Sequence, residues 1–216
     1  MRKLGLSTLA MMLLFAGYAM GDTLNVMVGD HDGYGLGCAD NSPPGACIWP
    51  GPGDSGTLYD GRDAAELAAT NGAQITDVYS AIFPEYGPNP LTAHVLMPFS
   101  GTLLAGTLTV GMGDFQSSAF GPILVDYNGV AQSWYYDDGF QATVLRTFTL
   151  DAAVIAAANA AHQLDIRLEH TPTYGDYVAF DFFQLQGQST VPEPGTLLLL
   201  GLGLVGFGTL TRKRVR

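Results

Sequence analysis

Hydrophobic and polar residues alternate along much of the chain, and this pattern predicts strands. The clearest case is 164–169, where Leu164, Ile166 and Leu168 face one way and charged residues lie between them. A period of two is typical of a strand with one buried face. Comparable runs, bounded by turn residues, predict further strands at 24–28, 75–82, 92–99, 103–112, 122–127, 132–136, 142–150 and 177–185.

Two short segments have helical character. In the segment 62–70, Asp63 and Glu66 have the spacing of a capping box. The segment 151–161 begins with a suitable N-cap, Asp151, and continues as a run rich in alanine. Two such helices are too few for repeated strand–helix–strand units. The pattern therefore predicts an all-β fold, an antiparallel β-sandwich of the jelly-roll type with two short helices.

A long segment at 30–61 has almost no periodicity and is rich in Gly, Pro, Asp and Asn. It is too long for a simple connection, so it is either a functional loop or a partly disordered one. It contains both cysteines of the chain, Cys38 and Cys47.

The beginning of the chain has the layout of a secretory signal peptide. The basic pair Arg2-Lys3 precedes an apolar run at 4–15, and small residues follow it as far as Gly21. We therefore assign residues 1–21 to an export signal that is removed. The alternative is a membrane anchor that is never cut.

The far end of the chain combines three features. Val191-Pro192-Glu193-Pro194 precedes an uncharged segment, 195–211, and a basic cluster follows at 212–216. As a helix, 195–211 covers roughly 25 Å, which is the short end of a membrane span. The cluster should stay cytoplasmic, so the preceding residues lie on the far side of the membrane. Its basic residues are Arg212, Lys213, Arg214 and Arg216.

Between the two ends we expect one folded domain at 22–186, joined to the tail by a polar linker at 187–190. The two prolines of the tail prevent a helix just outside the bilayer. Glu193, between them, should therefore lie in extended and accessible backbone.

This tail resembles the PEP-CTERM sorting signal, whose three parts occur in the expected order over 191–216. The resemblance implies that an exosortase, a membrane-embedded protease, recognises the chain near Pro192-Glu193-Pro194. It implies export across the inner membrane, removal of the transient membrane helix, and a final place at the cell surface or outside the cell. Exopolysaccharide of a biofilm matrix is the candidate partner. The alternative is an ordinary tail anchor.

The charge balance excludes one class of partner. Residues 22–190 contain nineteen acidic residues, three arginines and no lysine, a net charge of −16. The phosphates of a nucleic acid would be repelled by such a domain. Strong acidity favours solubility and suits cation-rich surroundings.

Export places Cys38 and Cys47 in an oxidising compartment, where a disulfide is the default. The loop that the bond would close contains Pro and Gly residues, which suit a tight turn. Two cysteines nine positions apart lack the paired spacing of a zinc site.

Three aspartates are candidate calcium ligands. Asp30 and Asp32 alternate in a Gly-bent loop, where two carboxylates can point at one ion. Asp181 lies on the last predicted strand, between two phenylalanines, and would be costly to bury without a partner. A cation would satisfy Asp181, and so would a hydrogen bond from a neighbouring loop. The alternative for Asp30 and Asp32 is a plain polar loop.

Aromatic and acidic residues leave two other functions open. Trp49, in the long loop, is the candidate for stacking on a sugar, whereas Trp134, Tyr135 and Tyr136 are on a strand, where core packing is commoner. The pairs Asp137/Asp138 and Asp176/Asp181 could support glycoside hydrolysis, but such pairs are expected by chance among nineteen acids. We assign no catalytic residue.

The leading expectation is a non-enzymatic exported protein of the cell surface or extracellular matrix. The alternatives are a carbohydrate-binding domain with a structural calcium, and a secreted glycoside hydrolase.

Overall fold

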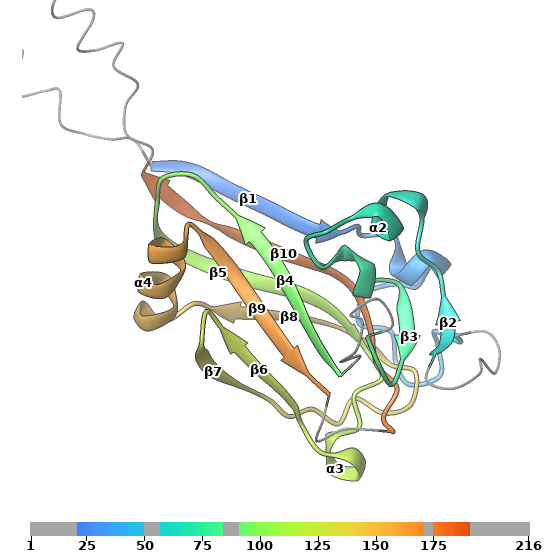
Figure 1. The fold of residues 1–216 in the computed structure, drawn as a ribbon. Helices are drawn as coiled ribbons and strands as arrows, with labels where there is room; N and C mark the ends of the chain where they lie inside the picture. The colour runs from blue at the N-terminus through green and yellow to red at the C-terminus, as the bar shows by residue number, and fades with distance from the viewer. Residues whose placement is uncertain (1–20, 50–56, 84–90, 171–174, 191–216) are drawn as a thin grey trace, which may run out of the picture. The chain divides into compact units, whose positions relative to one another are not determined.

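The computed structural model describes residues 21–49, 57–83, 91–170 and 175–190. Its strands form two four-stranded sheets, ordered β1-β10-β5-β8 and β4-β9-β6-β7, and a small sheet of β2 and β3 (Figure 1). The pairs β2–β3, β4–β9, β5–β8, β6–β7 and β6–β9 are antiparallel. The strands are β1 (Gly21–Gly29), β2 (Thr57–Asp60), β3 (Val78–Ser80), β4 (Thr92–Pro98), β5 (Thr102–Gly113), β6 (Ile123–Tyr127), β7 (Val130–Trp134), β8 (Thr143–Thr149), β9 (Gln163–Glu169) and β10 (Ala179–Thr190).

Helices are few and short in the described residues. The two predicted helices are confirmed as α2 (Ala64–Ala68) and α4 (Ala152–Ala161), and both elements of the α2 capping box are present. The structure adds α3 (Ser117–Phe120), a 3-10 turn η2 (Ala73–Ile75) and a wide turn η1 (Gly33–Gly37). No helix in the described part of the chain has the length and apolar character to cross a membrane.

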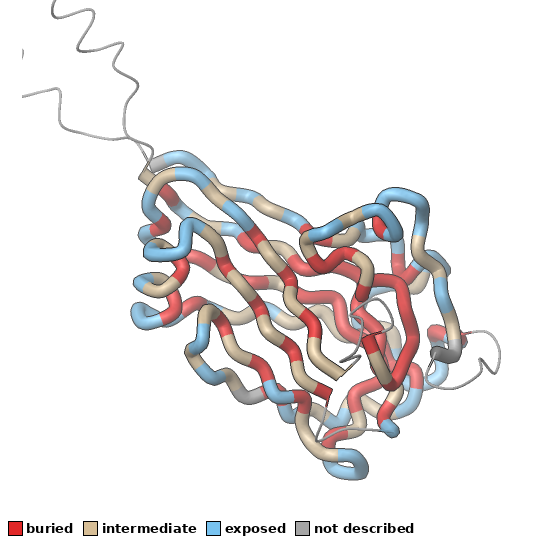
Figure 2. Tube along the Cα trace, in the orientation of Figure 1, coloured by how far each residue is buried: buried red, intermediate tan, exposed pale blue. Residues whose placement is uncertain are grey.

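The predicted fold, mostly β and antiparallel, is confirmed. Both four-stranded sheets contribute residues to one hydrophobic core. Along β9, the predicted inward residues Leu164, Ile166 and Leu168 are completely buried. The other sheet contributes residues such as Leu108 and Val110 of β5 to the same core. Figure 2 shows the resulting alternation of buried and less buried positions along the strands.

The two ends of this core are closed differently. Helix α4 contacts β5 and β9 and inserts Val154 and Ala158 into the core. The opposite end carries α2, η2 and the β2–β3 sheet, together with η1 (Figure 1). The candidate functional residues gather at this second end.

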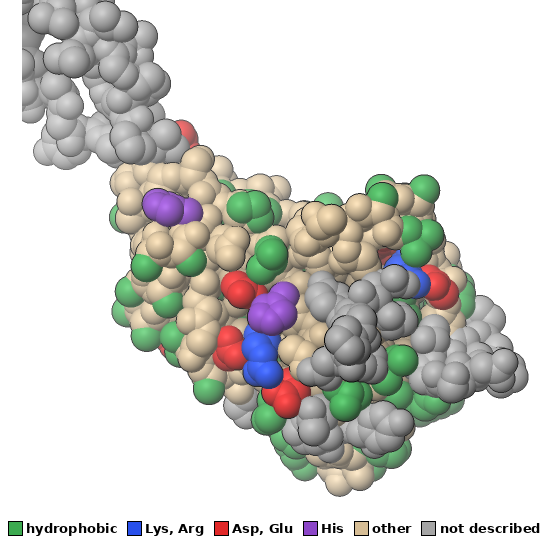
Figure 3. Space-filling model, viewed as in Figure 1, with side chains coloured by type: hydrophobic (Ala, Val, Ile, Leu, Met, Phe, Trp, Pro, Cys, Tyr) green, Lys and Arg blue, Asp and Glu red, His purple; other side chains and the backbone are tan. Residues whose placement is uncertain are grey.

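The outer face of β4, β9 and β6 carries paired charges rather than an apolar patch (Figure 3). His94 lies 2.9 Å from Asp165, and Arg167 lies 2.7 Å from Glu169 and 3.6 Å from Asp126. The alternation read from β9 thus separates a core face from a solvated face, as expected of a half-buried strand.

Three sequence-based boundaries were wrong. The predicted linker 187–190 is the end of β10, because its backbone continues to pair between β1 and β5 although its side chains are mostly polar. The predicted strand 75–82 is divided into η2 and β3, with Asp77 in a left-handed conformation at φ 57° between them. Strand β2 lies inside the segment that was expected to be loop.

The predicted signal peptide lies outside the described residues except for Gly21, the first residue of β1. The sorting tail at 191–216, including the predicted helix at 195–211 and the basic cluster, also lies outside them.

Candidate functional site

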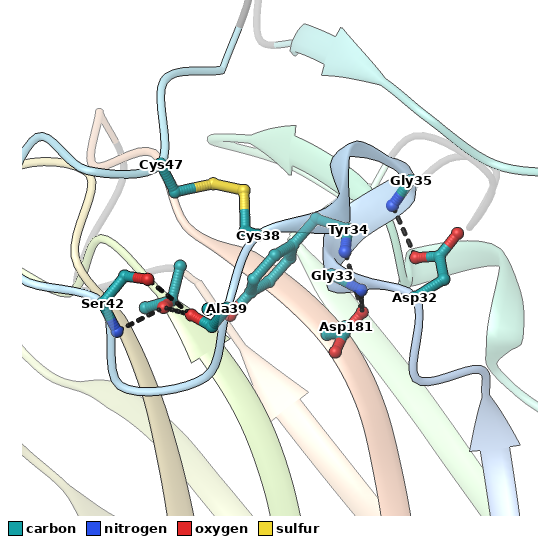
Figure 4. The surroundings of a disulfide bond; sticks show 10 residues. Asp32, Gly33, Tyr34, Gly35, Cys38, Ala39, Ser42, Cys47 and Asp181 are labelled. Atoms are coloured by element: carbon teal, nitrogen blue, oxygen red, sulfur yellow. Dashed lines mark hydrogen bonds between the residues drawn. A yellow bond between two sulfur atoms is a disulfide. The ribbon is translucent and has the colours of Figure 1, made fainter.

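The loop that follows β1 is held by the predicted disulfide. Cys38 and Cys47 are bonded, with their Cα atoms 5.6 Å apart (Figure 4). The loop is tied to β8 through Thr143, whose hydroxyl donates to Ala39 O at 2.8 Å and accepts from Ser42 N at 3.0 Å. The segment is therefore an ordered part of the domain from β1 to Cys47.

Asp181 anchors the first turn of this loop. Its side chain is 1% exposed, and its Oδ1 accepts from Gly33 N at 3.0 Å and Tyr34 N at 2.8 Å (Figure 4). Gly33 has φ 75°, and a Cβ there would lie 2.3 Å from Cys38 N, so only glycine fits this turn. The sequence left open whether a cation or a neighbouring loop would satisfy the buried Asp181. In the structure, the loop does so through two hydrogen bonds.

Three carboxyl groups meet beside this turn. Oxygens of Asp30, Asp32 and Asp77 all lie within 4.8 Å of one another. Asp30 follows β1, Asp32 caps η1 by accepting from Gly35 N at 2.6 Å, and Asp77 lies between η2 and β3. Three separate segments of the chain thus supply this acidic cluster.

The structure does not place Asp181 in that group. Asp181 instead lies within 4.8 Å of ligand atoms of His31 and Asp40. In this second group His31 Nε2 lies 3.0 Å from Asp40 Oδ2. Asp181 Oδ1 already accepts from the backbone N–H groups of Gly33 and Tyr34. The residue that joins Asp30 and Asp32 is Asp77.

A fourth carboxyl group touches the cluster from α2. Glu66 is buried and accepts from the Thr76 hydroxyl at 2.5 Å. Burial raises the pKa of Asp77 far above its usual range, and the charges of Glu66 and Asp32 raise that pKa further. Burial likewise raises the pKa of Glu66 and of Asp30. The cluster is therefore a place where negative charge is poorly tolerated without a counter-charge.

A surface hollow of about 220 Å³ adjoins the cluster at Asp30 and Glu66. Asp30, Asp63 and Glu66 line it together with apolar residues of β1 and α2. Asp30 and Asp32 are themselves exposed, so a hydrated ion can approach from this side.

The prediction that Trp49 is exposed for sugar stacking is wrong. Trp49 is 4% exposed, stacks on Tyr79 at 4.7 Å between ring centroids, and meets the edge of Tyr34. A Cβ on Gly113 of β5 would lie 2.7 Å from Cη2 of the Trp49 ring, so the absence of a side chain there lets the ring lie on the strand. The disulfide loop docks on the sheet and forms a second, aromatic core.

The remaining aromatic candidates do not form a row. Trp134 is 1% exposed and stacks on Phe148, as expected of a core residue. The guanidinium of Arg146 lies 3.5 Å from the ring centroid of Tyr136. Tyr135 and Tyr136 follow the end of β7 and do not lie on the strand as predicted, and of the two only Tyr135 is exposed.

The carboxylate pairs that could have served hydrolysis hold structure instead. Asp137 accepts from a backbone N–H of α3 at 2.7 Å, and Asp138 forms an ion pair with Arg146. Asp176 accepts from Gln116 N at 3.3 Å. Each of these groups, like Asp181, supports a turn or a loop.

A comparison with known families identifies the other functional segment. Residues 190–214 match the profile of the PEP-CTERM protein-sorting motif. The chain carries a PEP-CTERM sorting motif. The predicted resemblance is thereby confirmed, and the motif implies exosortase processing, export, and a place at the surface or the exterior of the cell. No curated protein and no solved structure matches the chain.

The PEP-CTERM match includes Val191, Pro192, Glu193 and Pro194 and most of the basic cluster. It begins at Thr190, the last residue of β10, so motif and strand are contiguous in sequence. The motif could be recognised from sequence because its parts are local and ordered along the chain.

Asp77 and Glu66 were not identified by sequence reasoning as part of the acidic site. Glu66 was assigned only to a capping box, and Asp77 to the interior of a strand. A tertiary contact brings both beside Asp30, and the only local signal was the tolerance of Asp for the left-handed conformation.

Proposed function

We propose that the domain ahead of the PEP-CTERM motif is a non-enzymatic component of the cell surface or of the exopolysaccharide matrix. The observation that carries this proposal is the motif itself, because it directs the chain to export and exosortase processing. The domain would then work outside the cell, after removal of the tail. Exopolysaccharide is its proposed partner.

The strand order supports a jelly-roll sandwich as the scaffold. In chain order, β1 neighbours β10, β4 neighbours β9, β5 neighbours β8, and β6 neighbours β7. Successive pairs alternate between the two sheets, so the chain runs as one long folded ribbon rolled into two layers. That arrangement is typical of eight-stranded jelly rolls.

The contacts of the acidic residues support the proposal that the domain is not an enzyme. General acid–base hydrolysis needs two carboxyl groups facing a common substrate position. In the described residues, Asp137, Asp138, Asp176 and Asp181 instead accept hydrogen bonds or pair with Arg146. The burial of Trp49 and Trp134 likewise weighs against a flat sugar-stacking platform, which leaves adhesion or matrix structure as the better supported function.

The sorting motif gives the test. We expect Glu193→Ala combined with Pro192→Ala, in a strain that makes an exosortase, to accumulate as a longer, membrane-bound form. The reason is that the substituted hinge no longer fits the protease while the tail still holds the chain in the membrane. Immunoblots of membrane, surface and medium fractions measure the distribution.

The matched control is Gln188→Ala, an exposed position on β10 just before the motif. This variant should be processed like the wild type. Unchanged processing of the double variant would contradict exosortase recognition at Pro192-Glu193-Pro194.

A further inference from the structure

The acidic cluster at the end of β1 contains one group whose burial demands a partner. Asp77 is 1% exposed, and its Oδ1 has no hydrogen-bond partner among the described residues. An isolated buried carboxyl oxygen is unfavourable, because it has lost water without gaining another donor. A bound ligand would give Asp77 Oδ1 the partner that it lacks among the described residues.

Two hydrogen bonds fix the backbone of Asp77. Its N–H donates to Phe180 O at 2.7 Å, and its C=O accepts from Gly61 N at 2.8 Å. Asp77 is thus fixed from two sides in its left-handed conformation. From this position its carboxyl group lies beside those of Asp30 and Asp32.

The charges that act most strongly on Asp77 are all negative. After burial, the groups that raise its pKa are Glu66, Asp32, Asp181 and Asp30. The nearby Arg62 directs its guanidinium to Asp60, at 2.6 and 2.8 Å, and to Gln74 O at 2.9 Å. A cation placed between the carboxylates would reverse the electrostatic balance of the cluster.

The spacing fits a calcium ion. Calcium takes carboxylate oxygens at about 2.3–2.6 Å, so two ligands of one ion lie no more than about 5 Å apart. The oxygens of the three aspartates fall within 4.8 Å of one another. Flexible coordination allows water from the adjoining hollow to complete the shell, whereas magnesium demands a regular octahedron and retains its water.

We propose that Asp30, Asp32 and Asp77 form a calcium site, with the buried Asp77 as its fixed ligand and Asp30 and Asp32 as its solvent-facing ligands. The buried Glu66 adds a further negative charge beside Asp77, which a bound cation would offset. The ion would fasten the disulfide loop to the turn before β3. The site belongs to the domain itself and does not depend on export or processing.

Calcium titration of the full-length chain, purified in detergent and stripped with EDTA, tests this site. We expect saturable heat on calcium addition, with a Kd no weaker than about 1 mM, the upper end for extracellular calcium modules, and a higher Tm with calcium than with EDTA. Asp30→Asn, at an exposed position, should weaken calcium affinity by more than about tenfold. Asp77→Asn should abolish the calcium response.

Two comparisons separate a calcium ligand from a structural residue. In EDTA, Asp77→Asn should melt at a higher temperature than the wild type, because the substitution removes a buried acid. Asp40→Asn, in the neighbouring group with His31, should keep the wild-type response.

Three results would overturn the site. They are the absence of any calcium response in the wild type, loss of the response in Asp40→Asn but not in Asp30→Asn, and an equal response to magnesium at matched ionic strength. The last result would indicate charge screening only.

Discussion

Several carboxyl groups of this domain are buried, and their burial raises their pKa values. In the described residues, Asp77, Asp114, Asp176 and Asp181 are all at most 3% exposed, and burial is the leading cause of a raised pKa in each. Their partners differ. Asp181 accepts from two loop N–H groups, whereas Asp176 accepts a long hydrogen bond from Gln116 N, and its Oδ1 has no partner among the described residues.

Asp176 should make the stability of the domain depend on pH. Burial, with the charges of Asp114 and Asp137, raises its pKa from 3.8 to about 6. The folded state therefore favours the protonated form, and this contribution is complete below about pH 4 and is lost as pH rises through about 6. We expect Asp176→Asn to gain about 3 kcal/mol over the wild type at pH 8, and little at pH 4.

Urea unfolding between pH 4 and pH 8, at a constant calcium concentration, measures this difference. Asp151→Asn is the control, since asparagine also caps a helix well, and it should follow the wild type. A constant difference between Asp176→Asn and the wild type across the range would show that Asp176 does not titrate as described.

At the scale of elements, the segment after β1 shows how an irregular sequence becomes ordered. The disulfide, the Asp181 hydrogen bonds and the packing of Trp49 on Tyr79 together hold η1 and the residues up to Cys47. The disulfide joins residues that are close in sequence, whereas the other two restraints join residues that are far apart in sequence. The aromatic core of Tyr34, Cys47, Trp49, Tyr79 and Ala179 is their common product.

Removal of the disulfide should loosen this element. We expect Cys38→Ser with Cys47→Ser to lower the free energy of unfolding by about 2–3 kcal/mol, because the open loop has more freedom in the unfolded chain. Tryptophan fluorescence during urea unfolding measures this free energy, since Trp49 packs in the aromatic core and becomes exposed when the domain unfolds. Ser42→Ala is the control for loss of a side-chain contact in the same loop, and an effect equal to that of the double variant would contradict a cross-link effect.

The strands could be predicted where one face is buried, and less well elsewhere. Alternation located β4, β5 and β9 closely because it reflects core packing directly. It could not locate β2 or the polar end of β10, whose order comes from backbone pairing. The site was predicted only in part: Asp30 and Asp32 are local in sequence, whereas Asp77 reaches them through the fold.

For the whole molecule, the acidic domain and the sorting motif are consistent with one destination. A domain with three arginines against nineteen acids suits a hydrated, cation-rich exterior, and the PEP-CTERM motif indicates how the chain arrives there. The disulfide is consistent with the oxidising side of the membrane. Calcium binding at the β1 end would add stability in the same surroundings.

The intact mass of the protein recovered from outside the cells tests export and processing most directly. We predict a chain that begins near residue 22 and ends close to the Pro192-Glu193-Pro194 segment, without the residues of the basic cluster. Recovery of the complete 216-residue chain from the cytosol, with neither end removed, would contradict the account.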